Sequence, residues 1–451
     1  MAEQQKMEEK SKAKYKKSFS PLLTIFLSFV LVIFIGTILL SLPFAVSSSS
    51  NSLSFIDALF ISTSAVCVTG LTTIANLSIT LSIFGKVVLA LLIQIGGLGL
   101  VTIVSFFLLS TGKRITFRTK KIMRDALNQS SFAKIKSIVK YIVIISVTFE
   151  LLGTIMNMFV FTNDYPFWTA LGISIFHSIS SFNNAGFDII GSTSMSVYSD
   201  NILLNFSTCF LVLCGGLGFL VIHDILKKRK WKDFSIQSKI VLIMNTSILA
   251  FSILVVKLLE GNAITWMQAV FYSVNLRTAG FSTFNLGKSL TSGASFLSLL
   301  LMFIGGSPLS TAGGIKTTTF FVLIMAFISY AKGKKTIVFK REVTSRAKYK
   351  AFILVISALL GVSLGIFLIL IFEKGRFSMQ DIIFECFSAF GTVGLSRGIT
   401  SQLGSASKVV ICLLMYFGRI GPVSVLTIWN PMINNPQKET VGYLSTDIMI
   451  G

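Results

Sequence analysis

Eight long apolar stretches follow one another along the chain, separated by segments that are polar or less apolar. A helix needs about 20 apolar residues to cross a hydrocarbon core of about 30 Å, and each stretch is of that order or longer. The stretches cover residues 22–42, 84–109, 141–161, 202–222, 240–259, 295–329, 351–372 and 408–428. The pattern predicts an all-α polytopic membrane protein with eight transmembrane helices, whose two termini lie on the same side of the membrane.

The segments between these stretches are of two kinds, and the two kinds alternate. The linkers 110–140, 223–239 and 331–350 and the N-terminal segment 1–17 are basic, and together they hold 29 of the 40 Lys and Arg residues. The other four gaps carry few charges. Because Lys and Arg gather in cytoplasmic loops, we expect the basic segments and both termini, including residues 429–451, on the cytoplasmic side.

The four weakly charged gaps repeat one pattern. Each contains an apolar stretch of about three helical turns, too short to span the membrane, and then a glycine followed by a large apolar residue. These glycines are Gly70, Gly186, Gly280 and Gly394. A second glycine-containing motif follows each of them and begins at Gly96, Gly215, Gly305 and Gly418. The chain is thus expected to consist of four tandem repeats of helix, pore loop and helix, over residues 18–109, 141–222, 240–330 and 351–428.

A short segment that enters the membrane and returns must be buried in protein or line a watery path, because lipid cannot satisfy its backbone polar groups. Four such turns around one axis would direct their carbonyl oxygens at a dehydrated cation, as in selectivity filters. The negative C-terminal end of the preceding half-helix would favour the same cation. The alternative is that the glycines only let helices pack closely, but four copies in register favour a pseudo-fourfold cation pore.

Composition and charge exclude other classes of protein. The chain is 53% hydrophobic and 13% charged, whereas soluble domains carry about 25% charged residues. Its net charge of +22 resides entirely in the four basic segments, since the remaining residues hold 11 basic and 11 acidic ones. This distribution is typical of membrane orientation and not of a nucleic-acid surface. The five cysteines show no C-x-x-C spacing, so neither a disulfide framework nor a zinc site is indicated.

Motifs for energy coupling or catalysis are also missing. AGGIKT resembles part of a phosphate-binding loop, but Ile315 separates Gly314 from Lys316 and no Gly-x-x-x-x-Gly-Lys frame exists. No Rossmann fingerprint and no cluster of His, Asp, Glu or Cys is present. We therefore expect no enzyme and no cofactor in this chain. The alternative to an ion pore is a secondary transporter of a small organic solute built from repeats with broken helices.

The four segments VTGL, NNAGF, RTAGF and TVGL, together with GGSPLSTAGGIKT from Gly305 to Thr317 and GRIGP from Gly418 to Pro422, resemble the Trk/Ktr/HKT superfamily of potassium transporters. The chain is most similar to the membrane (pore) subunit of bacterial Ktr systems. The resemblance implies potassium uptake through the bacterial plasma membrane, with Na⁺ as a candidate co-ion. It also implies a homodimer and a cytosolic ring of nucleotide-binding regulatory subunits.

By the same resemblance, K⁺ binds in a filter lined by backbone carbonyls from the four repeats. The filter residues would be Val68, Thr69, Gly70, Asn184, Ala185, Gly186, Thr278, Ala279, Gly280, Thr392, Val393 and Gly394. Each strand has a single glycine, which leads us to expect weak discrimination between K⁺ and Na⁺.

The resemblance further implies an intramembrane gate at residues 305–316. Its gating residues would be Gly305, Gly306, Ser307, Pro308, Gly313, Gly314, Lys316 and, from the last helix, Arg419. Independently of the resemblance, Pro and several Gly within ten residues are expected to break a helix, and a static kink is the alternative to a gate. Arg419 is expected in the middle of a spanning helix, where a charged group is costly and usually functional. The resemblance implies that it pairs with the gate or forms an electrostatic barrier. For Glu150 and Asp188 the sequence leaves the role open.

Overall fold

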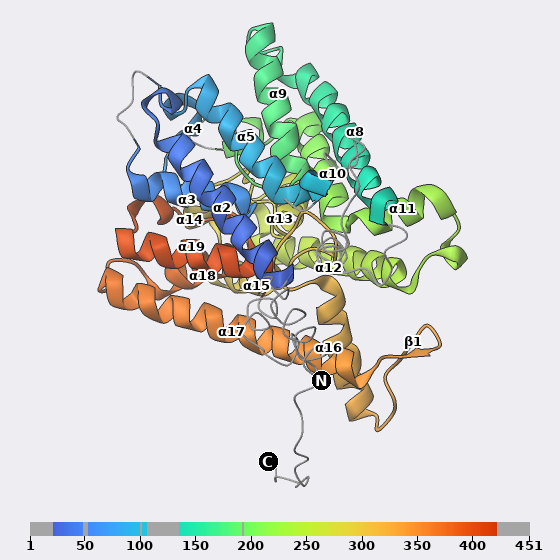
Figure 1. Cartoon of the computed structure of the whole chain (residues 1–451). Coiled ribbons are helices and arrows are strands. Elements are labelled where there is room, and N and C mark those ends of the chain that lie inside the picture. The colour runs from blue at the N-terminus through green and yellow to red at the C-terminus, as the bar shows by residue number, and fades with distance from the viewer. Residues whose placement is uncertain (1–20, 48–52, 100–101, 106–134, 192–193, 422–451) are drawn as a thin grey trace, which may run out of the picture.

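The computed structural model describes residues 21–47, 53–99, 102–105, 135–191 and 194–421. The basic segment 1–17, most of the linker 110–140 and the C-terminal segment 429–451 lie outside the described residues. The described chain is mainly helical and falls into four successive groups, each with a long helix, a short buried helix and a second helix of intermediate length (Figure 1).

The long first helices carry the clearest membrane signal. They are α2 (Pro21–Ser41), α8 (Ile135–Phe161), α12 (Ile236–Glu260) and α17 (Ser345–Glu373). Each is long and apolar enough to cross a membrane, yet only 22–28% of its most apolar window is buried within the protein. Most of these apolar side chains therefore face outward, which is stable where the surrounding solvent is lipid.

The short helices come next in each group and are largely buried. They are α3 (Phe55–Val66), α9 (Phe167–Phe182), α13 (Trp266–Asn275) and α18 (Met379–Gly391). Three begin with a hydroxyl N-cap, from Ser54, Thr265 and Ser378, which accepts a backbone N–H one turn into the helix. We call these the pore helices.

The second helices are α5 (Ile83–Leu98), α10 (Ile202–Leu217), α15 (Ser292–Phe303) and α19 (Ser405–Ile420). The stretches 84–109, 202–222 and 408–428 were each predicted as one continuous helix, and this is wrong at the glycine that ends each helix; residues 106–109 and 422–428 lie outside the described residues. They stop at Gly99, Gly218 and Gly421, which have φ angles of 79°, 90° and 88°. A left-handed residue cannot belong to a right-handed helix. After Gly218 the chain turns by 97° into α11 (Phe219–Lys228).

The third group is interrupted at the predicted place. Residues 304–316, called the interrupting loop below, are non-helical between α15 and α16 (Thr317–Ala331). The sequence indicated an interrupted second helix in this group alone, whereas the second helices of the other groups also end at a glycine. Within the described residues, the extended loop is found only in the third group.

The remaining elements are short. A two-stranded hairpin, β1 (Ile337–Val338) with β2 (Arg341–Glu342), lies in the basic linker 331–350 and was not predicted. The others are η1 (Pro43–Ala45), α4 (Leu77–Thr80), η2 (Ser194–Tyr198), η3 (Trp231–Asp233), η4 (Gly261–Ala263), α14 (Leu286–Ser289) and η5 (Thr400–Gln402).

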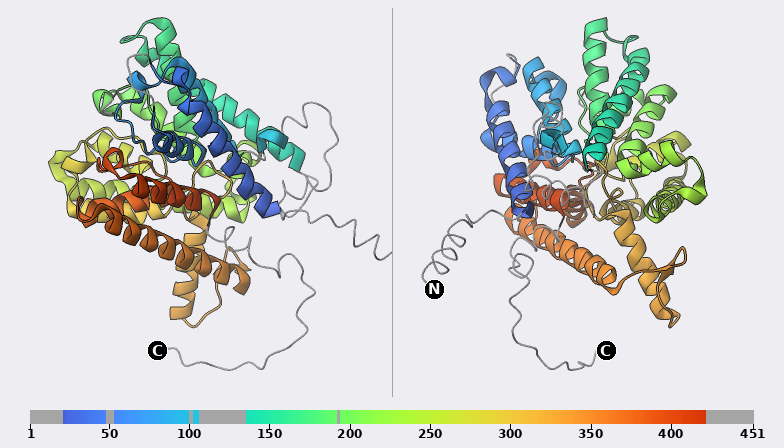
Figure 2. Two further views of the ribbon diagram at one scale, coloured as in Figure 1. Left: turned by 60° about the vertical axis from the view of Figure 1, so that its left-hand side comes forward. Right: turned by 45° about the vertical axis from the view of Figure 1, so that its right-hand side comes forward.

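The four groups close into a ring. Each pore helix packs against the second helix of the preceding group: α9 against α5, α13 against α10, α18 against α15, and α3 against α19. The last contact joins the beginning of the chain to its end, so that the blue helices of the first group lie beside the red helix α19 (Figures 1 and 2). The passage of the four second helices through a membrane remains a prediction.

Candidate functional site

The strands that follow the four pore helices meet at the centre of the ring. A methyl group added at the glycine of one strand would collide with the carbonyl oxygen just before the glycine of the next strand. The colliding pairs are Gly70 with Ala185, Gly186 with Ala279, Gly280 with Val393, and Gly394 with Thr69. The series closes on itself, so the predicted filter residues form one ring with approximate fourfold symmetry.

All four strands share one backbone conformation. The first residue of each has a positive φ: 57° at Val68, 58° at Asn184, 82° at Thr278 and 51° at Thr392. The glycine two positions later is also left-handed, with φ between 69° and 96°. Side chains with a Cβ resist this conformation, so four bulkier residues are held in it by their surroundings. Such strain is often found at functional sites.

The backbone N–H groups of these strands point back into their own pore helices. Thr69 N–H donates to Ser64 O at 2.8 Å, Ala185 N–H to Ser180 O at 2.7 Å, and Val393 N–H to Ser388 O at 2.8 Å. The N–H groups of Gly70 and Gly394 donate to side-chain Oγ atoms of Ser64 and Ser388, each at 3.1 Å. In the third strand Ala279 N–H donates to Asn275 O at 3.1 Å.

The carbonyl groups of the strands are left free. Among the described residues, no N–H or hydroxyl group donates a hydrogen bond to any carbonyl of the twelve predicted filter residues. Backbone carbonyls buried without a donor are rare in proteins. Because the strands carry no charged side chain, these oxygens are the groups that an ion would meet, and oxygen ligands suit hard cations.

Helix ends reinforce this preference for cations. The C-terminal residues of the pore helices are Val66, Phe182, Asn275 and Gly391, and at most two residues separate each from its filter strand. A helix C-terminus carries roughly half a negative charge. Four of them directed at one point favour a cation there.

The second glycine motif serves packing. A methyl at Gly96, Gly215 or Gly418 would strike the backbone of Val66, Phe182 or Phe390, at or near the end of the adjacent pore helix. These glycines therefore let helices pack closely. This was the alternative role for the filter glycines.

The interrupting loop lies against two of the filter strands. Gly313 N–H donates to Thr392 Oγ1 at 3.1 Å, and Thr311 Oγ1 lies 3.4 Å from Asn184 Oδ1. At its other side the loop binds the break between α10 and α11, where Ser307 N–H donates to Gly216 O at 3.1 Å and Phe219 N–H donates to Leu309 O at 2.9 Å. The loop therefore connects two of the filter strands to the break between α10 and α11.

Arg419 connects this loop to the first group. Its guanidinium donates to Thr311 O in the loop, and to Gly96 O and Gly97 O at the end of α5. Lys316 donates to Ala312 O within the loop at 2.6 Å. The expectation of a mid-helix position for Arg419 is wrong, because Gly421 ends α19 at Ile420 and leaves Arg419 in the last turn.

A buried arginine that was not predicted from the sequence also contacts the loop. Arg277 precedes the third filter strand, has 7% of its surface exposed, and donates to Gly305 O in the loop at 3.3 Å. A fixed positive charge at this place was not predicted from the sequence. Its place beside Thr278 in the motif RTAGF was the available signal.

Glu150, left open by the sequence, belongs to a buried network behind the second strand. Its Oε1 accepts from Gln94 Nε2 at 2.8 Å and from Asn183 Nδ2 at 3.3 Å. Asn183 also donates to Gln94 Oε1 at 2.8 Å and directly precedes the strand. A methyl at Gly97 would collide with the Asn183 side chain. The network thus ties the second strand to α5 and α8.

Asp188, whose role the sequence left open, and the buried His177 have local roles. Asp188 Oδ1 accepts from Ile190 N–H at 3.4 Å and closes a turn after the second strand. His177, in α9, shares a hydrogen bond of 2.9 Å with Thr208 in α10. All five cysteines are free, and three are buried.

Comparison with known proteins places the chain among transport proteins. It matches the family described as TrkH, cation transport protein, over residues 2–259 and 243–441. It is 38% identical to the Ktr system potassium uptake protein B of Bacillus subtilis, with 90% of this chain and 92% of the relative aligned. It is 34% identical to the potassium/sodium uptake protein NtpJ of Enterococcus hirae, with 98% and 99% aligned.

A solved structure has the same fold. The crystal structure of the potassium transporter TrkH from Vibrio parahaemolyticus superimposes with a TM-score of 0.73, covering 93% of this chain and 86% of the other. At 20% sequence identity this likeness bears on the fold alone.

Proposed function

The chain belongs to the TrkH family of cation transport proteins, and we propose that it carries potassium ions into the cell through the ring of four filter strands. As a member of this family it is a multi-pass membrane protein and not an enzyme. The carrying observation is the closed ring in which each glycine faces a carbonyl of the next strand. The carbonyls there have no hydrogen-bond donor among the described residues.

Potassium as the transported ion is supported by the relatives. The Bacillus protein is named for potassium uptake and the Enterococcus protein for potassium and sodium uptake. A dehydrated K⁺ would exchange its water shell for carbonyl oxygens of the twelve filter residues. With one glycine per strand, we propose that Na⁺ is discriminated weakly and is a candidate co-ion.

Gating is proposed for the interrupting loop. Its contacts with Thr392 and Asn184 at the ring, and with Arg419 and Arg277 on two sides, support a loop that closes the path and is released by movement of these partners. A static kink would not require a buried arginine, Arg277, and a partly buried one, Arg419, to bind its carbonyl groups, because a charged group is costly to bury.

The membrane arrangement and the partners are part of the same proposal. Eight crossings place the four basic segments and both termini in the cytoplasm of a bacterial cell. A homodimer of this chain and a cytosolic ring of nucleotide-binding subunits would complete the system. The alternative is a secondary transporter of an organic solute. That function would give the ring of carbonyl groups no role.

Growth tests this function. A bacterium that lacks potassium uptake should grow on low potassium when it expresses this chain with its regulatory partner. Gly186→Ala and Gly280→Ala should abolish growth, because the added methyl meets a backbone carbonyl in each case. Gly191→Ala is the matched control, since nothing lies within 4 Å of the added methyl. Failure of the well-expressed parent chain would count against potassium uptake.

A further inference from the structure

The fourfold arrangement places equivalent residues at four contacts between groups, each formed by the first turn of a second helix and the first turn of the next pore helix. The fourth residues of the second helices are Lys86 in α5, Asn205 in α10, Ser295 in α15 and Lys408 in α19. The third residues of the facing pore helices are Thr169, Gln268, Asp381 and Asp57. A direct comparison of the four contacts is therefore possible.

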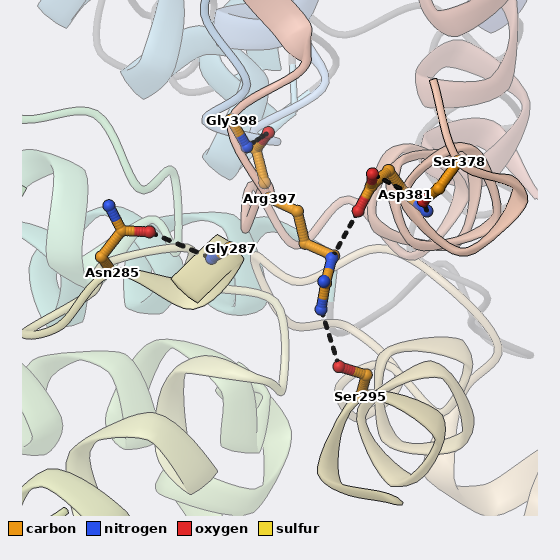
Figure 3. Close-up of polar contacts among 8 residues, drawn as sticks. Asn285, Gly287, Ser295, Ser378, Asp381, Arg397 and Gly398 are labelled. Carbon is orange, nitrogen blue, oxygen red and sulfur yellow. Dashed lines mark hydrogen bonds and ion pairs between the residues drawn. The ribbon is translucent and has the colours of Figure 1, made fainter. Parts of the chain in front are cut away.

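Charge is balanced at the two contacts that include an acidic residue. Lys408 Nζ lies 2.8 Å from Asp57 Oδ1. At the contact of α15 with α18, the Arg397 side chain lies between Asp381 Oδ1, at 2.6 Å, and Ser295 Oγ, at 2.8 Å (Figure 3). The third contact is uncharged, and Asn205 donates to backbone carbonyls including Tyr198 O at 3.0 Å.

Lys86 differs from these residues. It faces Thr169 where two equivalent positions have Asp, and its ammonium group has no ion pair or hydrogen bond with any described residue. An ammonium group that leaves water without a counter-charge is costly in apolar surroundings. An anion bound at this contact would supply the counter-charge that Lys86 lacks among the described residues.

The space in front of Lys86 is an apolar groove of about 440 Å³ between α5 and α9. Its walls are formed mainly by Ile83, Val87, Ala90, Trp168, Ile173 and Phe176. Ile83 and Trp168 are 82% and 79% exposed, so the groove opens on the outer surface of the helices. Tryptophan is typical of the membrane interface, which locates this end of the groove at the level of lipid headgroups.

The equivalent groove between α15 and α18 shows what is specific to this one. It measures about 330 Å³ and is lined from the same positions of the second helix, Ser292, Ser295, Phe296 and Leu299. There the polar residue is a serine bound to an arginine whose charge Asp381 balances. Both grooves are apolar. Of the two, only the groove at Lys86 has a cation without a counter-charge among the described residues.

We propose that the groove between α5 and α9 binds an anionic phospholipid of the bilayer. The headgroup phosphate binds the Lys86 ammonium, and an acyl chain lies along Val87, Ala90 and Ile173. A zwitterionic lipid supplies the same acyl chain but carries its own cation, so Lys86 selects for net negative charge. One basic residue near the surface favours an anionic lipid roughly fivefold.

Quenching of Trp168 fluorescence tests the proposal on the full chain reconstituted in vesicles. Phosphatidylglycerol or phosphatidylcholine with brominated acyl chains is added as the minor lipid in unbrominated phosphatidylcholine. The contribution of Trp168 is the signal lost in Trp168→Phe. Phosphatidylglycerol should quench this signal at roughly one fifth of the concentration that phosphatidylcholine requires. Lys86→Gln should remove the difference, and Lys86→Arg should keep it.

Ser295→Ala, in the equivalent groove, is the matched control and should leave the preference at Trp168 unchanged. Equal quenching by the two lipids in the parent chain, or a preference that survives in Lys86→Gln, would overturn the proposal. A third outcome would also overturn the proposal: neither lipid quenches Trp168, and Ile83→Cys forms a disulfide between two copies of this chain. The groove would then be a contact between subunits.

Discussion

Removal of the Arg419 guanidinium should release the interrupting loop. Arg419 joins the loop carbonyl of Thr311 to the carbonyls of Gly96 and Gly97 at the end of α5. Arg419→Met keeps a long side chain and removes the charge and all the donors. If the loop closes the path, the variant should conduct more ions than the parent chain in the absence of any regulatory partner.

The size of the effect follows from the contacts that are lost. A hydrogen bond from a charged group contributes about 1.5–3 kcal/mol. The bond to Thr311 is the one that holds the loop, and its loss alone shifts the equilibrium between closed and open loop by roughly 10- to 150-fold. Flux should rise by up to that factor and level off when the loop is open throughout.

Uptake of radioactive rubidium into vesicles that contain the purified chain is a suitable assay. Arg376→Met is the matched control, because Arg376 has a half-exposed side chain three residues after the end of α17 and pairs with Glu373 at 4.0 Å. A second comparison uses a chain with residues 309–313 deleted, which should itself conduct more. Adding Arg419→Met to the deletion should change nothing further. Unchanged flux in Arg419→Met, or the same increase in both backgrounds, would refute the reasoning.

Two further predictions concern the network behind the second strand. Glu150→Ala should lower the Tm of the protein in detergent, because the amide donors of Gln94 and Asn183 lose a shared acceptor, at about 1–3 kcal/mol per buried group. Glu150→Gln keeps an acceptor and should recover most of this loss; a Tm equal to that of the parent in Glu150→Ala would argue against the network. Gly97→Ala should also lower the Tm, by overpacking against Asn183 worth about 1–3 kcal/mol. Combining it with Asn183→Ala should restore part of the loss, and no recovery would mean that the methyl acts elsewhere.

The helical elements and the four glycine turns were predictable because their causes are local. Apolar stretches of spanning length gave the first helices, and the long helices α8, α12 and α17 extend the predicted ranges by a few residues at their ends. The interruption after Phe303 followed from Pro308 and the surrounding glycines. Repetition of a motif at similar spacing indicated that Gly70 and Gly394 would meet, although 324 positions separate them.

The ends of the second helices were not predictable from hydropathy. The residues after Gly99, Gly218 and Gly421 are as apolar as those before them, so the apolar pattern continues where the helix stops. What ends the helix is a positive φ at one glycine. A glycine in sequence permits that conformation without requiring it, and neighbouring elements decide the outcome.

Buried polar groups depend on tertiary structure in the same way. Glu150 has its partners 56 positions earlier and 33 positions later in the chain. Arg277 binds a carbonyl 28 positions away. The sequence shows that such residues are costly inside a membrane protein, but their partners become known only from the packing of three different groups.

The central claim is that the four strands form one filter and contribute alike. Its most direct test is the ratio of K⁺ to Na⁺ permeability, from reversal potentials in mixed salts, for Gly70→Ala, Gly186→Ala, Gly280→Ala and Gly394→Ala. Each methyl meets a carbonyl of the next strand, and a positive φ adds about 1–2 kcal/mol of strain. We predict that all four variants lose conduction or lower the ratio by a similar factor. A normal ratio and normal flux in any two of them would contradict a filter built from the four strands.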